Sequence, residues 1–146
     1  MICLGCYKKV QKKEYCLSCR KKLFGGNRVP PVLDLDKPKP ENISMYNEHT
    51  KRLSISGVQL KYSLRLVGNT LELCEKNGQY ILKPIPSADH LVSMEDAPEN
   101  EHLTMQIAAQ VFKIKAAHNA LIYFKDGTPA YLTKRFDVKT DGTKYI

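Results

Sequence analysis

Two pairs of cysteines near the N-terminus constrain this chain more than any other feature. Cys3 with Cys6 and Cys16 with Cys19 form the pattern C-x2-C-x9-C-x2-C. Two intervening residues let both sulfurs of a pair reach one ion from a tight turn, and two such pairs complete a tetrahedral site. The spacing therefore predicts a structural zinc ion in a small module over residues 1–28. Four thiolates leave no open position for a catalytic zinc.

The alternative to a metal site is a pair of disulfide bonds. The N-terminal stretch MICLGCYKK has no basic segment followed by an apolar core, so it does not have the form of a secretory signal. No apolar run approaches the roughly 20 residues that a membrane-spanning helix needs. We therefore expect a cytoplasmic protein without a membrane association, where disulfides are rare and zinc is favoured. The fifth cysteine, Cys74, is expected to be an ordinary core or surface thiol.

Positive charge is concentrated in the same N-terminal module. The chain has a formal net charge of +8, and residues 1–28 hold eight basic side chains against Glu14 alone, which leaves +1 for the rest. A zinc ion with four thiolates would lower the charge of the module from +7 to about +5. Such a module either contacts nucleic acid, or simply presents lysines to solvent while the metal holds a segment with few apolar residues. The second interpretation is favoured, and direct nucleic-acid binding is the weaker one.

The remainder of the chain alternates between strand and turn signals. Residues 29–50 are predicted to be a linker, because VPPVLDLDKPKPE holds four prolines and no helical or strand period. YSLRLV, TLELCEK and QYILKP alternate apolar and polar residues and are separated by Gly68-Asn69 and Asn77-Gly78, which predicts a three-stranded antiparallel meander. A helix is then expected near Asp96, followed by a hairpin of HNALIYF and PAYLTKRF around Asp126-Gly127.

The spacing of apolar residues in the expected helix predicts which of its faces is buried. Leu103, Ile107 and Val111 recur at i+4, so this face is expected to pack against the sheet. The fold class that follows is α+β: a small zinc-knuckle module followed by an antiparallel sheet with one packed helix.

A lysine in the third expected strand suggests an anion site. In QYILKP, alternation places Ile81 and Lys83 on one face, and a lysine on an otherwise apolar face is unusual unless it meets an anion or a carboxylate. The polar loop SISGVQ, residues 54–59, precedes the first strand, and Lys61 adds a cation at its exit. Glu99 and Glu101 begin the following helix. A loop, a strand lysine and a helix glutamate in this order are the parts with which a protein-kinase N-lobe holds ATP. The alternatives are a lysine that extends to water and glutamates that favour the helix dipole.

Four segments carry a family resemblance. SISGVQLKYSL, YILKP, PENEHLTMQIA and YLTKRFD resemble, in this order, the HipA family of bacterial serine/threonine kinases, the toxins of toxin–antitoxin pairs. The opening CLGCYKK…CRKKLFGG resembles a short cysteine segment found before the kinase in some relatives. The resemblance covers roughly residues 50–140. It implies that residues 51–146 form a HipA-like kinase N-lobe, the ATP-binding part of the fold.

The resemblance implies roles for individual residues. Ser54 and Ser56 would be autophosphorylated, and the added negative charge would displace the loop from the ATP phosphates. Lys83 would contact the α- and β-phosphates, with Glu101 or Glu99 as its anchor, and residues 134–136 would be the hinge that meets adenine. Magnesium would be bound together with a C-lobe. The residues expected to bind the nucleotide are Ser56, Gly57, Val58, Gln59, Lys61, Lys83, Glu101, Lys134 and Phe136.

The chain also departs from the family pattern. Leu60 stands where relatives often have proline, and the zinc module replaces the subdomain that precedes the kinase in single-chain toxins. No catalytic aspartate is assigned, since Asp137 does not resemble part of a catalytic loop, so we expect this chain to be inactive alone and to self-associate. The partners implied are a helix-turn-helix antitoxin, a separate protein that supplies the missing subdomain, and an aminoacyl-tRNA synthetase as substrate. The alternative function is a non-catalytic zinc-ribbon module that contacts nucleic acid or a protein.

Overall fold

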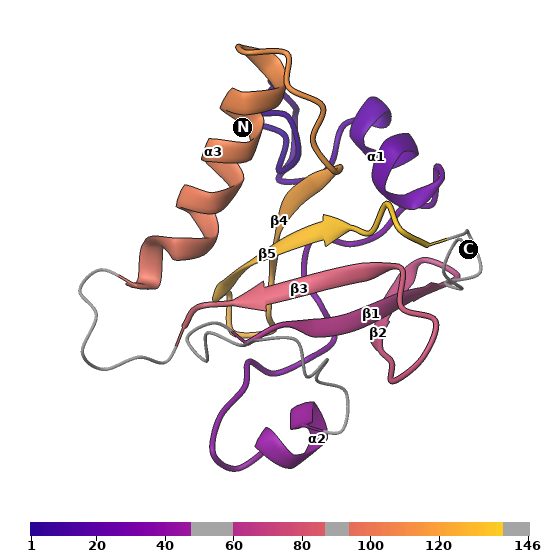
Figure 1. Ribbon diagram of the computed structural model, residues 1–146, viewed down its shortest axis with the longest axis vertical. Coiled ribbons are helices and arrows are strands. Elements are labelled where there is room, and N and C mark those ends of the chain that lie inside the picture. The colour runs from indigo at the N-terminus through magenta and orange to yellow at the C-terminus, as the bar shows by residue number, and fades with distance from the viewer. Residues whose placement is uncertain (48–59, 87–93, 139–146) are drawn as a thin grey trace.

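A computed structural model of the chain describes residues 1–47, 60–86 and 94–138 (Figure 1). Five antiparallel strands form one curled sheet in the order β2-β1-β3-β5-β4, with helices beside it. The predicted α+β class, with a cysteine cluster near the N-terminus, is confirmed. No helix among the described residues is long and apolar enough to cross a membrane. The elements are α1 (Leu17–Phe24), α2 (Ile43–Asn47), β1 (Tyr62–Val67), β2 (Thr70–Leu73), β3 (Tyr80–Pro84), the short 3-10 helix η1 (Met94–Asp96), α3 (Ala97–Gln110), β4 (Asn119–Tyr123) and β5 (Pro129–Lys134).

Two of the predicted hairpins are present, and the meander is not. Gly68 and Gly127, at φ 62° and 85°, allow the tight β1–β2 and β4–β5 turns. β3 pairs with β1 and not with β2, so β1 lies between them. The connection between β2 and β3 therefore passes over β1, close to Ser63. The approach is so close that a Cβ added at Gly78 would lie 1.8 Å from the Ser63 hydroxyl oxygen. Asn77-Gly78 therefore serves a close backbone crossing, where only glycine fits, and does not close a hairpin.

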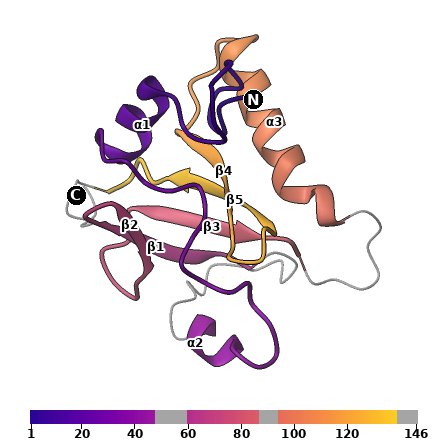
Figure 2. The same ribbon diagram turned by 180° about the vertical axis from the view of Figure 1, so that it is seen from behind.

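Helix α3 buries a different face from the predicted one. Leu103, Ile107 and Val111 are 47%, 41% and 67% exposed, so the prediction of their burial is wrong. The buried residues of α3 are Pro98 and His102. The helix packs on β4 and β5 and beside the N-terminal module, as Figures 1 and 2 both show. Its inner face therefore meets polar partners as well as apolar ones, which a pattern of apolar residues alone does not detect.

The N-terminal module and the sheet share one hydrophobic cluster. Phe24 of α1 lies between Tyr15 and Tyr80, with ring centroids at 5.2 and 5.8 Å. The Tyr15 hydroxyl donates to the Leu121 carbonyl at 2.7 Å, and the Tyr80 hydroxyl donates to the Leu23 carbonyl at 2.6 Å. Because aromatic packing and buried hydrogen bonds cross between them, α1 and the sheet form a continuous core.

The proline-rich segment runs along the edge strand β4. The Leu33 N–H donates to the Tyr123 carbonyl at 2.7 Å, and the Tyr123 N–H donates to the Pro31 carbonyl at 2.9 Å. Farther on, the ring of buried Tyr46 packs on Tyr62 at 4.7 Å. The backbone hydrogen bonds to Tyr123 cover part of an otherwise open sheet edge. The domain boundaries expected at residues 28 and 50 stay predictions.

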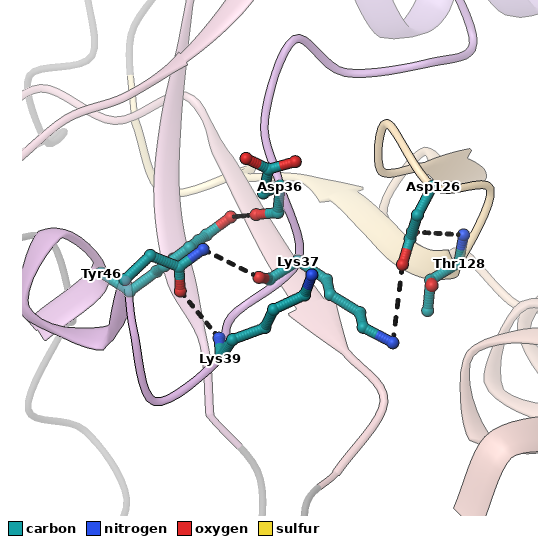
Figure 3. Close-up of polar contacts among 7 residues, drawn as sticks. Asp36, Lys37, Lys39, Tyr46, Asp126 and Thr128 are labelled. Atoms are coloured by element: carbon teal, nitrogen blue, oxygen red, sulfur yellow. Dashed lines mark hydrogen bonds and ion pairs between the residues drawn. The ribbon is translucent and has the colours of Figure 1, made fainter.

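Polar contacts also fix this segment beside the β4–β5 hairpin (Figure 3). The Tyr46 hydroxyl donates to the Asp36 carbonyl. Lys37 Nζ lies 3.5 Å from Oδ2 of Asp126. The other carboxylate oxygen of Asp126, Oδ1, accepts a hydrogen bond from the Thr128 N–H at 2.9 Å. The side chain of Asn42 bonds to backbone atoms of the same segment, so the segment is held at several points.

Candidate functional site

The four N-terminal cysteines form one cluster. The sulfur atoms of Cys3, Cys6, Cys16 and Cys19 all lie within 4.8 Å of one another. Cys16 stands at the N-cap position of α1, without a side-chain capping hydrogen bond, and Cys19 lies in the first turn of the helix, whereas the first pair lies in the preceding loop. A Cβ at Gly5 would lie 2.6 Å from the sulfur of Cys19, so only glycine allows the loop this close to α1. Four thiolates in this arrangement can hold a metal ion, and the donor set fits the predicted structural zinc.

Hydrogen bonds within the cluster stabilise negative charge on sulfur. The pKa of Cys3 is lowered to about 4, chiefly by a hydrogen bond from Cys19 and also by the backbone of Cys16 and Gly5. The N–H groups of Gly5 and Cys16 lie 3.3 and 3.2 Å from the Cys3 sulfur. Cys19, the partner in that bond, has its pKa raised. A thiolate is the form that binds metal, so the fold prepares Cys3 as a ligand.

The cysteine cluster is tied to helix α3. The ring of Tyr7 packs on His102 of α3 at 4.9 Å, and Gln110 Nε2 donates to the Cys6 carbonyl at 3.0 Å. His102 is fully buried, and its Nδ1 lies 2.9 Å from the Asn119 side-chain oxygen of β4. Burial lowers the pKa of His102, so the ring is neutral and supplies packing and one hydrogen bond.

Sequence reasoning missed this histidine. His102 stands alone among acidic and apolar residues in PENEHLTMQIA, and its partner Asn119 is distant in the chain. The structure brings them together because α3 crosses the start of β4. Pro98, His102 and Met105 are spaced three or four residues apart, as residues on one face of a helix are. This spacing is the signal in the sequence that indicates the buried face.

An ion pair joins β3 to α3. Lys83 Nζ lies 2.5 Å from Glu101 Oε1, with the two side chains 18% and 29% exposed. The lysine lies 5.5 Å from the ring centroid of Tyr131, its cross-strand partner on β5. Burial and the nearby Glu101 carboxylate raise the pKa of Tyr131 to about 12. The glutamate that pairs with Lys83 is thus Glu101, whereas Glu99 makes no ion pair with any described residue.

The remaining predicted site residues lie elsewhere or outside the described part. Lys134 stands opposite Tyr80 and its Nζ donates to the Lys22 carbonyl at 3.3 Å, and Phe136 is 84% exposed. Lys61 lies just before β1 and is half-exposed. Of the predicted nucleotide residues, the structure therefore brings together Lys83 and Glu101. The predicted loop residues Ser54, Ser56, Gly57, Val58 and Gln59 lie outside the described residues.

Cys74 gives a first testable prediction. It is 6% exposed, and burial raises the pKa of its thiol. Because the thiolate is the reactive form, the native zinc-loaded protein should resist iodoacetamide at Cys74 near neutral pH. The rate should rise as the pH is raised toward the elevated pKa, and it should rise much further in urea. Mass mapping of the alkylated peptide checks this, and rapid native labelling near neutral pH would contradict it.

Comparison with known proteins covers the part of the chain that contains the ion pair. Residues 53–145 match a family model described as the HipA-like C-terminal domain, which is more than half of the chain. No curated protein matches the chain. The matched range includes all five strands, α3, Lys83 and Glu101, whereas the cysteine cluster precedes it. The chain therefore belongs to the HipA family.

Proposed function

We propose that the chain is the nucleotide-binding portion of a HipA-like serine/threonine protein kinase. The observation that carries the proposal is the Lys83–Glu101 ion pair between β3 and α3, inside the matched range. Protein kinases use a lysine on strand β3, paired with a glutamate of the following helix, to hold the phosphates of ATP. The ammonium group of Lys83 is held on the sheet by a carboxylate and is still partly accessible, as a phosphate contact requires.

The cysteine module has a supporting role in this proposal. Tyr7 packs on His102, the residue next to Glu101, and Gln110 at the far end of α3 bonds to the Cys6 carbonyl. A metal ion would hold the loop that carries Tyr7 and Cys6, and this loop holds α3. With a metal bound by the four cysteines, this loop and α3 would keep the Glu101 carboxylate in place to orient Lys83, and the role of the metal would be structural.

Regulation is proposed at Ser54 and Ser56, which precede β1 and lie outside the described residues. Phosphorylation of Ser54 or Ser56 adds up to about two negative charges, which repel the phosphates of ATP. The proposed partners are those that the family resemblance implies: a helix-turn-helix antitoxin, a separate protein that supplies an N-terminal subdomain, and an aminoacyl-tRNA synthetase as phosphorylation substrate. Co-purification of the chain with a co-expressed antitoxin tests the first of these.

Titration of the zinc-loaded protein with a fluorescent ATP analogue and magnesium tests the proposal. Lys83→Met should weaken binding at least about tenfold, since it removes a charge-assisted contact to phosphate. Lys125→Met is the matched control, because it breaks another ion pair, between the β4–β5 connection and Asp34, that involves neither β3 nor α3. Equal binding by the wild type and Lys83→Met, with both folded by circular dichroism, would contradict the proposal.

A further inference from the structure

A cavity of about 470 Å³ lies where the cysteine module meets the end of α3. Its walls come from the cysteine loop, α1, the last turns of α3 and residues 113–119, which lead into β4. α1, the end of α3 and the start of β4 lie close together in Figures 1 and 2. Its volume falls within the roughly 300–1,000 Å³ typical of ligand sites. Neither Lys83 nor Glu101 lines it, so it is separate from the proposed nucleotide site.

The described residues that line this cavity carry positive charge without a matching carboxylate. Lys8, Lys22, Lys113 and Lys115 line it, and no aspartate or glutamate does. None of these four lysines makes an ion pair with a described residue. The nearby Lys134 and Lys22 charges add to burial in lowering the pKa of His118, another wall residue, which indicates a positive local potential.

The cysteine cluster does not cancel this charge. A zinc ion with four thiolates has a formal charge of −2, and two of the ligands, Cys6 and Cys19, line the cavity. The four positive charges of the lysines exceed the two negative charges of such a zinc cluster. Ser18 adds a neutral hydroxyl group to the same walls, whereas the side-chain amide of Gln110 already donates to the Cys6 carbonyl and to Gln106 Oε1. Ammonium and hydroxyl donors around one cavity suit the oxygen atoms of a phosphate group.

We propose that this cavity, lined by Lys8, Lys22, Lys113 and Lys115, binds the sugar–phosphate backbone of a single-stranded nucleic acid. A strand fits better than a mononucleotide because a further lysine lies beside the cavity: Lys134 does not line it, but its Nζ donates to the carbonyl of the wall residue Lys22 at 3.3 Å. A strand carries a phosphate every few ångströms, so it can neutralise charges inside and outside the cavity together. This inference does not depend on nucleotide binding at Lys83.

Fluorescence anisotropy with a labelled single-stranded RNA of roughly 16 nucleotides tests the inference on the zinc-loaded chain. The variant Lys113→Gln/Lys115→Gln should bind about tenfold more weakly, and the slope of log K against log salt should become shallower by about 0.7 for each lost contact. The control Lys39→Gln/Lys76→Gln removes the same charge from exposed residues outside the cavity and should bind as the wild type does.

Zinc content and melting temperature are measured for every variant. Equal binding by the two double variants would overturn the inference, because binding would then depend on net charge alone. Loss of zinc from the cavity variant, with unchanged RNA binding, would also overturn it and would assign the lysines to the metal centre. Displacement of the RNA by inorganic triphosphate at equal phosphate concentration would show a small-anion site and would equally refute a strand.

Discussion

Replacing Cys16 with serine should remove the metal and lower the free energy of unfolding by about 5 kcal/mol or more. For a chain of this size this corresponds to a fall in Tm of roughly 10–20 °C. Serine is itself a favoured N-cap residue, so the substitution should not weaken the start of α1. The loss of stability then measures the contribution of the metal ligand. The reason for so large an effect is that the cysteine loop is tied to α3 and to the shared core.

Calorimetry together with bound zinc per chain measures this effect. Cys74→Ala is the matched control, because it removes a cysteine that lies outside the cluster. It should keep the full zinc content and lose only the small packing contribution of a buried thiol. A Cys16→Ser protein that melts with the wild type, or a wild type without bound metal, would show that the cluster does not stabilise the fold.

Phe24→Ala should lower the free energy of unfolding by about 3–5 kcal/mol. Its ring is 1% exposed and lies between Tyr15 of the module and Tyr80 of β3. Removing it leaves a cavity at the junction of the two parts, where their packing is continuous. Unfolding of the wild type and the variant should each remain a single transition, because neither part has a separate core.

Urea denaturation followed by both near-ultraviolet and far-ultraviolet circular dichroism makes this measurement. Phe136→Ala is the control, since that ring is 84% exposed and its removal should change stability by less than about 0.5 kcal/mol. Two separate transitions in the wild type would show that the module folds independently of the sheet.

The strands and the Lys83–Glu101 ion pair could be predicted from the sequence, because short patterns of neighbouring residues indicate them. Alternation in QYILKP predicts that Lys83 lies on one face of the strand and that Tyr80 and Leu82 lie on the other. The structure buries Tyr80 and Leu82. The candidate partners of a lysine on such a face were few, and Glu99 and Glu101 lie at the start of the following helix. The cysteine spacing likewise specifies one tight cluster without reference to the rest of the chain.

What the sequence did not reveal depends on contacts between distant segments. The position of β1 between β2 and β3 follows from the crossing of Gly78 over Ser63, and a turn signal such as Asn77-Gly78 does not distinguish a crossing from a hairpin. The buried face of α3 is set by Tyr7, which lies far before His102 in the sequence, and by Asn119, which lies after it. Local propensity carries no information about such partners.

Hydrogen–deuterium exchange of the zinc-loaded chain, with and without magnesium and ATP, tests the central claim most directly. If Lys83 and Glu101 hold a nucleotide, ATP should slow exchange in the peptides that contain β3 and the first turns of α3. The same peptides should show no change in Lys83→Met. Unchanged exchange at β3 and α3 when ATP saturates the wild type, or protection confined to other peptides, would contradict the proposed nucleotide site.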